Sequence, residues 1–221
     1  MGPLSVWRLG LLIVAGSLAG ALSLSAAQPA QLSVDRIDNG RSFQSLLEIR
    51  RSKVVVQKWD LSCGAAVLAT ILRYQFNDPV SEREIAQELM RRREYLDNPL
   101  LVRAREGFSM LDLKRYVDGR GYEGVGLGQL TMRDLYELAP VIVPVSFRGY
   151  NHFVVFRGTL GNRVLLADPA YGNRTMLHER FEEAWPDHPR FGRVGFVVRR
   201  PGSPELVNHL APAPSDFVSL R

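Results

Sequence analysis

The chain has 221 residues, of which 46% are hydrophobic and 23% charged, so its composition excludes wholesale disorder and suits one domain of roughly 150 residues with extensions. Its single cysteine excludes an intrachain disulfide and a cysteine-rich zinc or iron–sulfur site. The net charge of +5 comes mostly from arginines interleaved with acids, as in Glu82-Arg83-Glu84, which predicts solvated helix surfaces and no nucleic-acid partner.

The first 27 residues have the layout of a secretory signal peptide. Arg8 provides a short basic region, residues 9–24 are an uncharged stretch of 16 residues, and Ser25-Ala26-Ala27 offers the small residues that a signal peptidase reads. The uncharged stretch is shorter than the ~20 apolar residues that span a bilayer, although a retained inner-membrane anchor remains an alternative. We therefore expect a periplasmic protein in which residues 28–50 form an N-terminal extension.

Helices are expected in the first half of the chain. Helical spacing of apolar residues, and a capping box from Ser81 to Glu84, predict helices at residues 63–74, 81–93, 109–119 and 131–138. The first of these carries small and apolar side chains on nearly all sides, which predicts a central, buried helix. Residues 42–50 are compatible with a short amphipathic helix or turn.

Strands are expected in the second half. Runs rich in β-branched and aromatic residues, separated by turn residues, lie at residues 141–147, 152–157, 164–168 and 194–199. Helices followed by strands predict an α+β domain at residues 51–200, with helices packed against one side of an antiparallel sheet. Residues 201–221 are rich in proline and predict a tail without regular elements.

Cys63 is the first candidate for chemistry. A structural cysteine in an exported protein usually has a disulfide partner, and Cys63 has none, so it is either a buried inert thiol or a reactive one. It stands at the start of the predicted central helix, where free N–H groups and the helix dipole stabilise a thiolate. Gly64 follows it and permits close approach of a substrate backbone.

His152 and Asp168 form the second candidate. His152 begins an apolar strand beside a loop, and Asp168 ends the next strand after the turn at residues 158–162. If this hairpin is symmetric about Leu160, the two side chains lie directly opposite each other, with Cβ atoms about 4.5–5.5 Å apart. The pair would make a base with an orienting acid. Alternatively, Asp168 forms a β-turn and hydrogen-bonds its own backbone.

The remaining polar candidates are weaker on their own. Gln57 precedes Cys63 by six residues, and a side-chain amide there can donate to an oxyanion, although a surface glutamine is the ordinary alternative. The other histidines, His178, His188 and His209, have polar or proline-rich neighbours and are expected at the surface.

Three separated motifs together resemble one known family. The run Gln57-Lys58-Trp59-Asp60-Leu61-Ser62-Cys63-Gly64-Ala65-Ala66, the strand Asn151-His152-Phe153-Val154-Val155 and the turn Asp168-Pro169-Ala170-Tyr171-Gly172 resemble, in the same order, the C39 peptidase family. Papain-like domains of this family process bacteriocin precursors and cleave leader peptides after a double glycine. The resemblance covers about residues 51–190. It implies a papain-like cysteine peptidase, without a metal or cofactor, in which Cys63 is the nucleophile, His152 the general base and acid, Asp168 the orienting residue and Gln57 the oxyanion donor.

The best-known family members are cytoplasmic domains of peptidase-containing ABC exporters, from which this chain departs. It carries a predicted export signal and has no Walker P-loop, so we expect no covalently fused ABC transporter. It resembles the stand-alone exported members, some of which accompany functional-amyloid secretion systems. The resemblance implies a secreted or leader-bearing polypeptide substrate, with an outer-membrane or amyloid export system as a candidate partner.

Two other functions stay open at this point. The domain could hold an extended polypeptide without cutting it, as an adaptor or chaperone for a secreted substrate. It could also be a cell-wall amidase or endopeptidase with a related Cys–His core.

Overall fold

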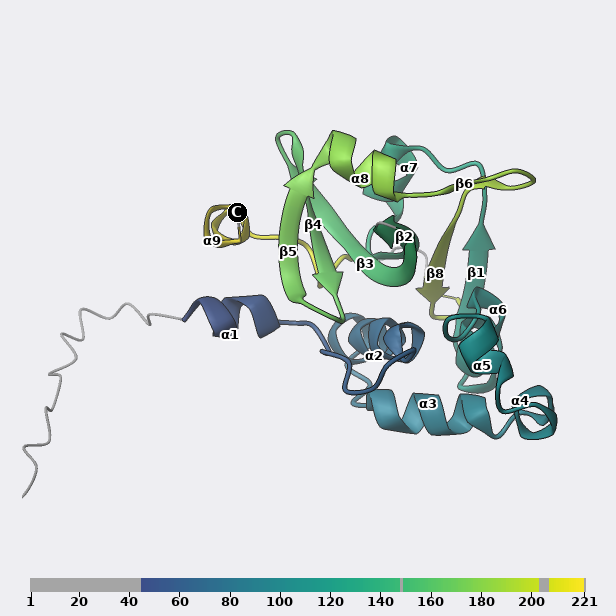
Figure 1. Cartoon of the computed structure of the whole chain (residues 1–221). Helices are drawn as coiled ribbons and strands as arrows, with labels where there is room; N and C mark the ends of the chain where they lie inside the picture. Colours follow the sequence, from purple (N-terminus) through teal and green to yellow (C-terminus); the bar gives the residue numbers. More distant parts are fainter. Residues whose placement is uncertain (1–44, 148, 203–206, 221) are drawn as a thin grey trace, which may run out of the picture. The chain divides into compact units, whose positions relative to one another are not determined.

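Figure 1 shows the computed structural model, which describes residues 45–147, 149–202 and 207–220. A six-stranded antiparallel sheet runs in the order β1-β8-β2-β3-β4-β5. Its strands are β1 (Glu123–Leu127), β2 (Val141–Phe147), β3 (Tyr150–Leu160), β4 (Arg163–Asp168), β5 (Gly172–Leu177) and β8 (Gly195–Arg199). A short hairpin of β6 (Asp187–His188) and β7 (Gly192–Arg193) stands beside the sheet.

The predicted signal peptide, residues 1–27, and most of the predicted extension lie outside the described residues. Within the part of the chain that is described, no helix is long and apolar enough to cross a membrane. Of the extension, α1 (Leu46–Arg51) is described, and its Ser45–Glu48 capping box explains why the helix begins there.

One face of the sheet packs on a group of helices that includes the predicted central helix. These helices are α2 (Cys63–Phe76), α3 (Glu82–Met90) and α6 (Met110–Gly119). Because α2 is buried over nearly its whole length, only small and apolar side chains fit around it, as its sequence predicts. Capping boxes start α3 at Ser81 and α6 at Ser109, which confirms both predicted helices.

The opposite face is also covered, which corrects the expectation of helices on one side. The helices on this face are α7 (Met132–Leu138) and α8 (His178–Ala184). Leu135 of α7, Phe181 of α8 and Trp185, which follows α8, form a second apolar cluster with residues of the sheet. In Figure 1 these two helices lie on the opposite side of the sheet from α2 and α3. The side chains of β2 point alternately into the two clusters, and most of the strand is buried. Covering only one face of the sheet would leave half of these apolar side chains exposed to water.

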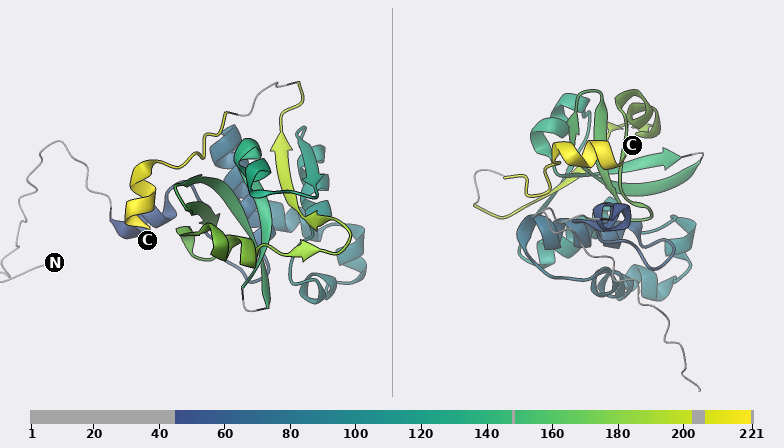
Figure 2. Two further views of the ribbon diagram at one scale, coloured as in Figure 1. Left: turned by 90° about the horizontal axis from the view of Figure 1, so that it is seen from above. Right: turned by 90° about the vertical axis from the view of Figure 1, so that its left-hand side faces the viewer.

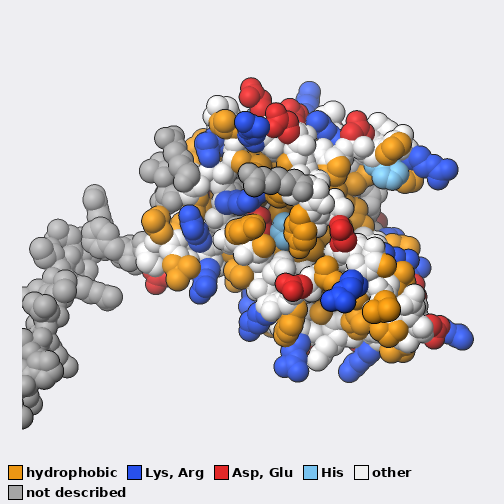
Figure 3. Space-filling model, in the orientation of Figure 1, with side chains coloured by type: hydrophobic (Ala, Val, Ile, Leu, Met, Phe, Trp, Pro, Cys, Tyr) orange, Lys and Arg blue, Asp and Glu red, His pale blue; other side chains and the backbone are white. Residues whose placement is uncertain are grey.

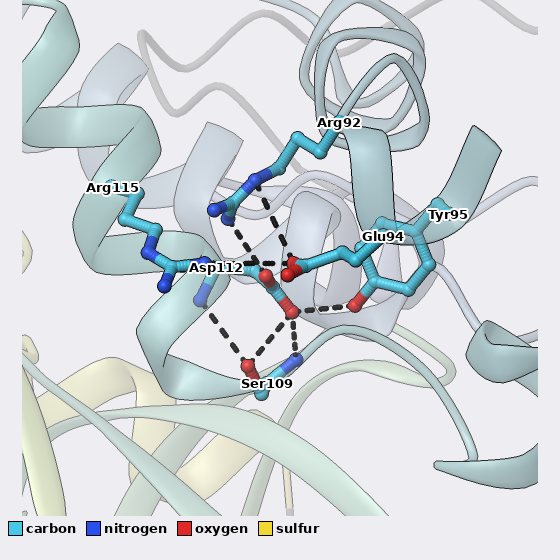
Figure 4. Close-up of polar contacts among 6 residues, drawn as sticks. All are labelled: Arg92, Glu94, Tyr95, Ser109, Asp112 and Arg115. Carbon is cyan, nitrogen blue, oxygen red and sulfur yellow. Dashed lines mark hydrogen bonds and ion pairs between the residues drawn. The ribbon is translucent and has the colours of Figure 1, made fainter. Parts of the chain in front are cut away.

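Between α3 and α6 the chain forms two unpredicted short helices, α4 (Arg93–Asp97) and α5 (Leu101–Ala104). Figure 4 shows how the buried Asp112 of α6 anchors this segment. Its carboxylate accepts from Tyr95 Oη at 2.6 Å, from Arg92 Nη1 at 2.8 Å and from Ser109 N at 2.8 Å. Burial and the neighbouring carboxylate raise the pKa of Tyr95 to about 12, so the phenol keeps the proton that it donates. The network fixes the loop that leads to Gly107, which packs beside Leu61, two residues before Cys63.

The expectation of a tail without regular elements is wrong for residues 207–220. The segment ends in α9 (Pro214–Ser219), which Figure 2 shows beside α1, and its Phe217 packs with Leu165 of the sheet and Ile49. Leu210 is fully buried, and its carbonyl oxygen accepts from Arg157 Nε at 2.7 Å. Proline at the first helical turn does not break a helix, because its missing N–H has no intrahelical partner there anyway.

Candidate active site

Cys63 is the first residue of α2, and its side chain is a free, buried thiol. The residue before it, Ser62, occupies the N-cap position but makes no side-chain capping bond to the helix. The N–H groups of the first turn are therefore left uncapped by a side chain, and they add to the positive end of the helix dipole at the sulfur.

The loop before Cys63 is held by Glu82 of α3. Its carboxylate accepts from Ser62 Oγ at 2.5 Å and from the Lys58 backbone N–H at 3.0 and 3.1 Å. Glu82 is only 3% exposed, so its assignment to a solvated helix surface is wrong. The clamp fixes a loop in which Leu61 adopts a left-handed backbone with φ of 65°, a conformation that non-glycine residues rarely adopt.

His152 and Asp168 meet, but not as directly opposed residues. The two-residue turn at Gly161-Asn162 and a bulge near Gly158 pair Val155 with Ala167, so direct opposition about Leu160 is wrong. Extending that register places Asp168 two residues from the position opposite His152, a diagonal neighbour. The imidazole bridges the diagonal, and His152 Nε2 lies 2.8 Å from Asp168 Oδ1.

Asp168 combines the two interpretations that its sequence left open. Its Oδ1 accepts from Ala170 N at 2.9 Å and from Tyr171 N at 3.4 Å, which is the turn interpretation, while the same oxygen contacts the His152 ring. The carboxylate is fully buried. The turn thus fixes the carboxylate in place, and the fixed carboxylate orients the imidazole.

The electrostatics of His152 follow from these neighbours. Burial opposes the charged imidazolium and is the largest influence, but the hydrogen bonds and negative charges of Asp168 and Cys63 outweigh it and raise the pKa of His152 to about 9. Asp168 occupies Nε2, so Nδ1 is the ring nitrogen left to exchange a proton with the Cys63 sulfur.

Gln57 is connected to this group through its backbone. Its N–H donates to Pro169 O, next to Asp168, at 2.7 Å. Its side-chain Nε2 donates to Trp59 O at 3.2 Å, and its buried Oε1 has no hydrogen-bond partner among the described residues. The structure therefore brings Cys63, His152 and Asp168 together and joins Gln57's loop to them, with the Gln57 amide nitrogen bonded inside its own loop.

Aromatic and acidic side chains surround the site, and the sequence did not single them out. Tyr150 and Tyr171 are 49% and 69% exposed, and the Tyr150 ring lies 5.9 Å from the His152 ring. Burial, followed by the charges of Cys63, Asp60 and Glu106, raises the pKa of Tyr150, so these three groups lie near its phenol. Figure 3 shows a histidine side chain in the middle of this face, between hydrophobic side chains.

The other histidines lie outside this group. His188 and His209 are exposed, as expected, and the half-buried His178 contacts Tyr136 at 3.3 Å. Over the described ranges, no three histidine, cysteine or acidic side chains gather as a metal site would require.

Several known proteins are similar to this chain. A family model described as the peptidase C39 family matches residues 51–188. Two curated proteins named "Probable functional amyloid protease FapD" are similar to this chain. The one from Pseudomonas aeruginosa is 39% identical over 146 residues, 66% of this chain, and the one from Pseudomonas fluorescens is 36% identical over 178 residues, 79% of this chain. The alignments span 62% and 73% of those two proteins, so the chain covers less than two thirds of the length of the first.

Among solved structures, the peptidase domain of Streptococcus ComA, described as a bifunctional ABC transporter involved in a quorum-sensing pathway, has a similar fold. The TM-score is 0.51 at 18% sequence identity, over 66% of this chain and 97% of that one. The similarity is one of fold, and it agrees with the papain-like α+β architecture predicted from the sequence.

Proposed function

Because this chain belongs to the peptidase C39 family, we propose that it is a cysteine endopeptidase that processes an exported polypeptide of a functional-amyloid secretion system. The observation that carries the proposal is the buried His152–Asp168 pair, 2.8 Å between Nε2 and Oδ1, beside a free thiol at the start of α2. The names of the two Pseudomonas relatives support the choice of substrate class.

In the proposed mechanism, Cys63 gives its proton to His152 and the thiolate attacks the scissile carbonyl carbon. The carbonyl oxygen becomes an oxyanion that the Cys63 backbone N–H stabilises. His152 then gives the proton to the leaving amine as the C–N bond breaks, which leaves a thioester. Water, deprotonated by His152, hydrolyses the thioester and restores the thiol.

Gln57 is proposed as the second oxyanion donor. In the structure one N–H of its Nε2 donates to Trp59 O, and the second N–H of the amide is the one proposed to donate to the oxyanion. The backbone bond from Gln57 to Pro169 keeps its loop beside the site.

The proposed compartment is the periplasm, with residues 1–27 as the export signal, removed after export or retained as an inner-membrane anchor. The proposed partner is an outer-membrane or amyloid export system that acts on the same polypeptide. A secreted or leader-bearing substrate then meets the enzyme after export.

The test compares the wild-type chain with Cys63→Ala on a secreted amyloid subunit, with fragments identified by mass spectrometry. Cleavage by the wild type and none by a folded Cys63→Ala protein is expected. Cleavage that persists in the folded variant would remove the proposal. Binding of the subunit without cleavage by either protein would favour the adaptor function, and digestion of muropeptides instead would favour a cell-wall enzyme.

A further inference from the structure

We propose that Arg174 is a positioning residue of this peptidase, whose guanidinium holds the second carboxylate oxygen of Asp168 so that the first stays fixed on His152. The inference rests on the proposed function, since it assigns one more residue to the same site. Arg174 lies on β5 opposite Leu166, and nothing in its local sequence distinguishes it from the other arginines.

The two oxygens of Asp168 have different partners. Oδ1 faces His152 Nε2 and the backbone N–H groups of Ala170 and Tyr171. Oδ2 faces Arg174 Nε at 3.3 Å, as an ion pair. Within the described ranges, His152 and Arg174 are the only cationic side chains that form ion pairs with Asp168. A fully buried carboxylate is costly without a compensating charge, so Arg174 compensates it on the side that His152 does not reach.

Arg174 is itself held in place by two aromatic rings. Its guanidinium carbon lies 4.5 Å from the centroid of the Phe147 ring, at the end of β2, and 5.6 Å from that of Tyr171. Its side chain is 28% exposed. Arg174 Nε and Asp168 Oδ2 form an ion pair without hydrogen-bond geometry, so the contact is one of charge. A planar guanidinium can stack on a ring and keep its charge beside a carboxylate at once, which the compact ammonium of lysine cannot do. The two rings therefore hold the Arg174 guanidinium on the Oδ2 side of Asp168, where its positive charge compensates the negative charge of the carboxylate.

The charge of Arg174 also acts on the protonation of His152. The other titratable groups beside the ring are Cys63 of α2, Asp168 and Tyr150, and the groups near Tyr150 are Asp60, Glu106 and Tyr171. None of these side chains carries a positive charge, so Arg174 is a nearby positive charge that opposes them. Its removal makes the potential at His152 more negative, and the imidazolium then keeps its proton to higher pH.

Alkylation of Cys63 measures this without a known substrate. Iodoacetate carries a negative charge and is attracted by the imidazolium, whereas neutral iodoacetamide is not. The ratio of their rate constants therefore falls at the pH where His152 loses its proton, near 9 in the wild type. We compare wild type and Arg174→Gln with Arg193→Gln as the matched control. Arg193 is 31% exposed, lies 5.5 Å from the Trp185 ring and pairs with Glu182 at 3.4 Å, outside the triad.

The midpoint of the ratio is expected to rise by about one pH unit in Arg174→Gln and to stay unchanged in Arg193→Gln. A midpoint that is unchanged in Arg174→Gln, or that falls, overturns the inference. If Arg174→Gln does not fold, Arg174→Lys replaces it: the retained charge keeps the midpoint, while loss of the stacked guanidinium slows alkylation by iodoacetamide about threefold or more. A wild-type alkylation rate in Arg174→Lys then overturns the inference.

The same measurement separates this inference from the proposed function. If wild-type Cys63 reacts with iodoacetamide at pH 7 no faster than free cysteine, the proposed function fails. If it reacts faster, and Arg174→Gln keeps the wild-type midpoint, only the role of Arg174 fails.

Discussion

Glu82 supplies the sharpest test of how the nucleophile is held. Replacing it with alanine leaves the Lys58 backbone N–H without its acceptor, while the Ser62 hydroxyl can still donate to the Trp59 carbonyl oxygen at 2.6 Å. A donor left unsatisfied in a buried site costs about 1–3 kcal/mol, so Glu82→Ala is expected to lower the free energy of unfolding by about that amount. The left-handed backbone of Leu61 can then relax, because the clamp that opposes its strain is gone.

Urea unfolding measures the stability loss, and alkylation of Cys63 by iodoacetamide at pH 7 measures the loop. The matched control is Glu84→Ala, two residues along the same helix, where the exposed carboxylate serves the capping box of Ser81. The control should lose less stability and keep the wild-type alkylation rate, whereas Glu82→Ala should alkylate more slowly. Equal losses in the two variants, with equal alkylation rates, would refute the clamp.

Three further predictions follow from the site and the core. Asp168→Asn keeps an oxygen for His152 and for the Ala170 N–H, so its kcat/KM should exceed that of Asp168→Ala by at least about tenfold. Because the pKa of His152 is raised to about 9, its protonation stabilises the folded state, fully below about pH 6.5 and no longer once the pH has risen through about 9. The free energy of unfolding measured in urea should therefore fall by about 3 kcal/mol across that interval in the wild type, and this fall should be absent in His152→Gln. Leu210→Ala should cost about 3 kcal/mol, against less than about 0.5 kcal/mol for the exposed Val207→Ala, and a loss at Leu210 as small as the control would contradict docking of the C-terminal segment.

The elements that could be predicted from the sequence are those whose signals are local. The capping box at Ser81 and the unbroken small and apolar surface of residues 63–74 place α3 and α2, since both features lie within one helix. The run at residues 141–147 coincides with β2 because a strand buried on both faces must be apolar along most of its length.

The elements that could not be predicted depend on distant contacts. A Cβ atom at Gly124 of β1 would lie 2.7 Å from Val117 and 2.8 Å from Phe196, so this strand needs glycine where a strand pattern would call for a bulky residue. In β5 the buried Asn173 accepts from Arg157 and donates to the Ile49 carbonyl oxygen. A buried polar residue does not produce the alternation of apolar and polar residues from which a strand is predicted. The helix α9 has local signals in its first-turn proline and in Asp216, which accepts from Ala213 N, but its packing on Leu165 depends on contacts that are distant in sequence.

The same distinction separates the residues that carry the chemistry from those that hold them. Cys63, His152 and Asp168 stand out in sequence because a helix start and the ends of two predicted strands are local features, although β3 begins two residues before His152. Glu82 does not, because its burial is decided by a loop some twenty residues earlier that brings Lys58 and Ser62 to it. Its neighbour Arg83 has the same local surroundings and is exposed, so charge pattern alone cannot tell the two apart. A residue that positions a catalytic group is defined by what folds onto it, and that becomes visible only when the tertiary contacts are known.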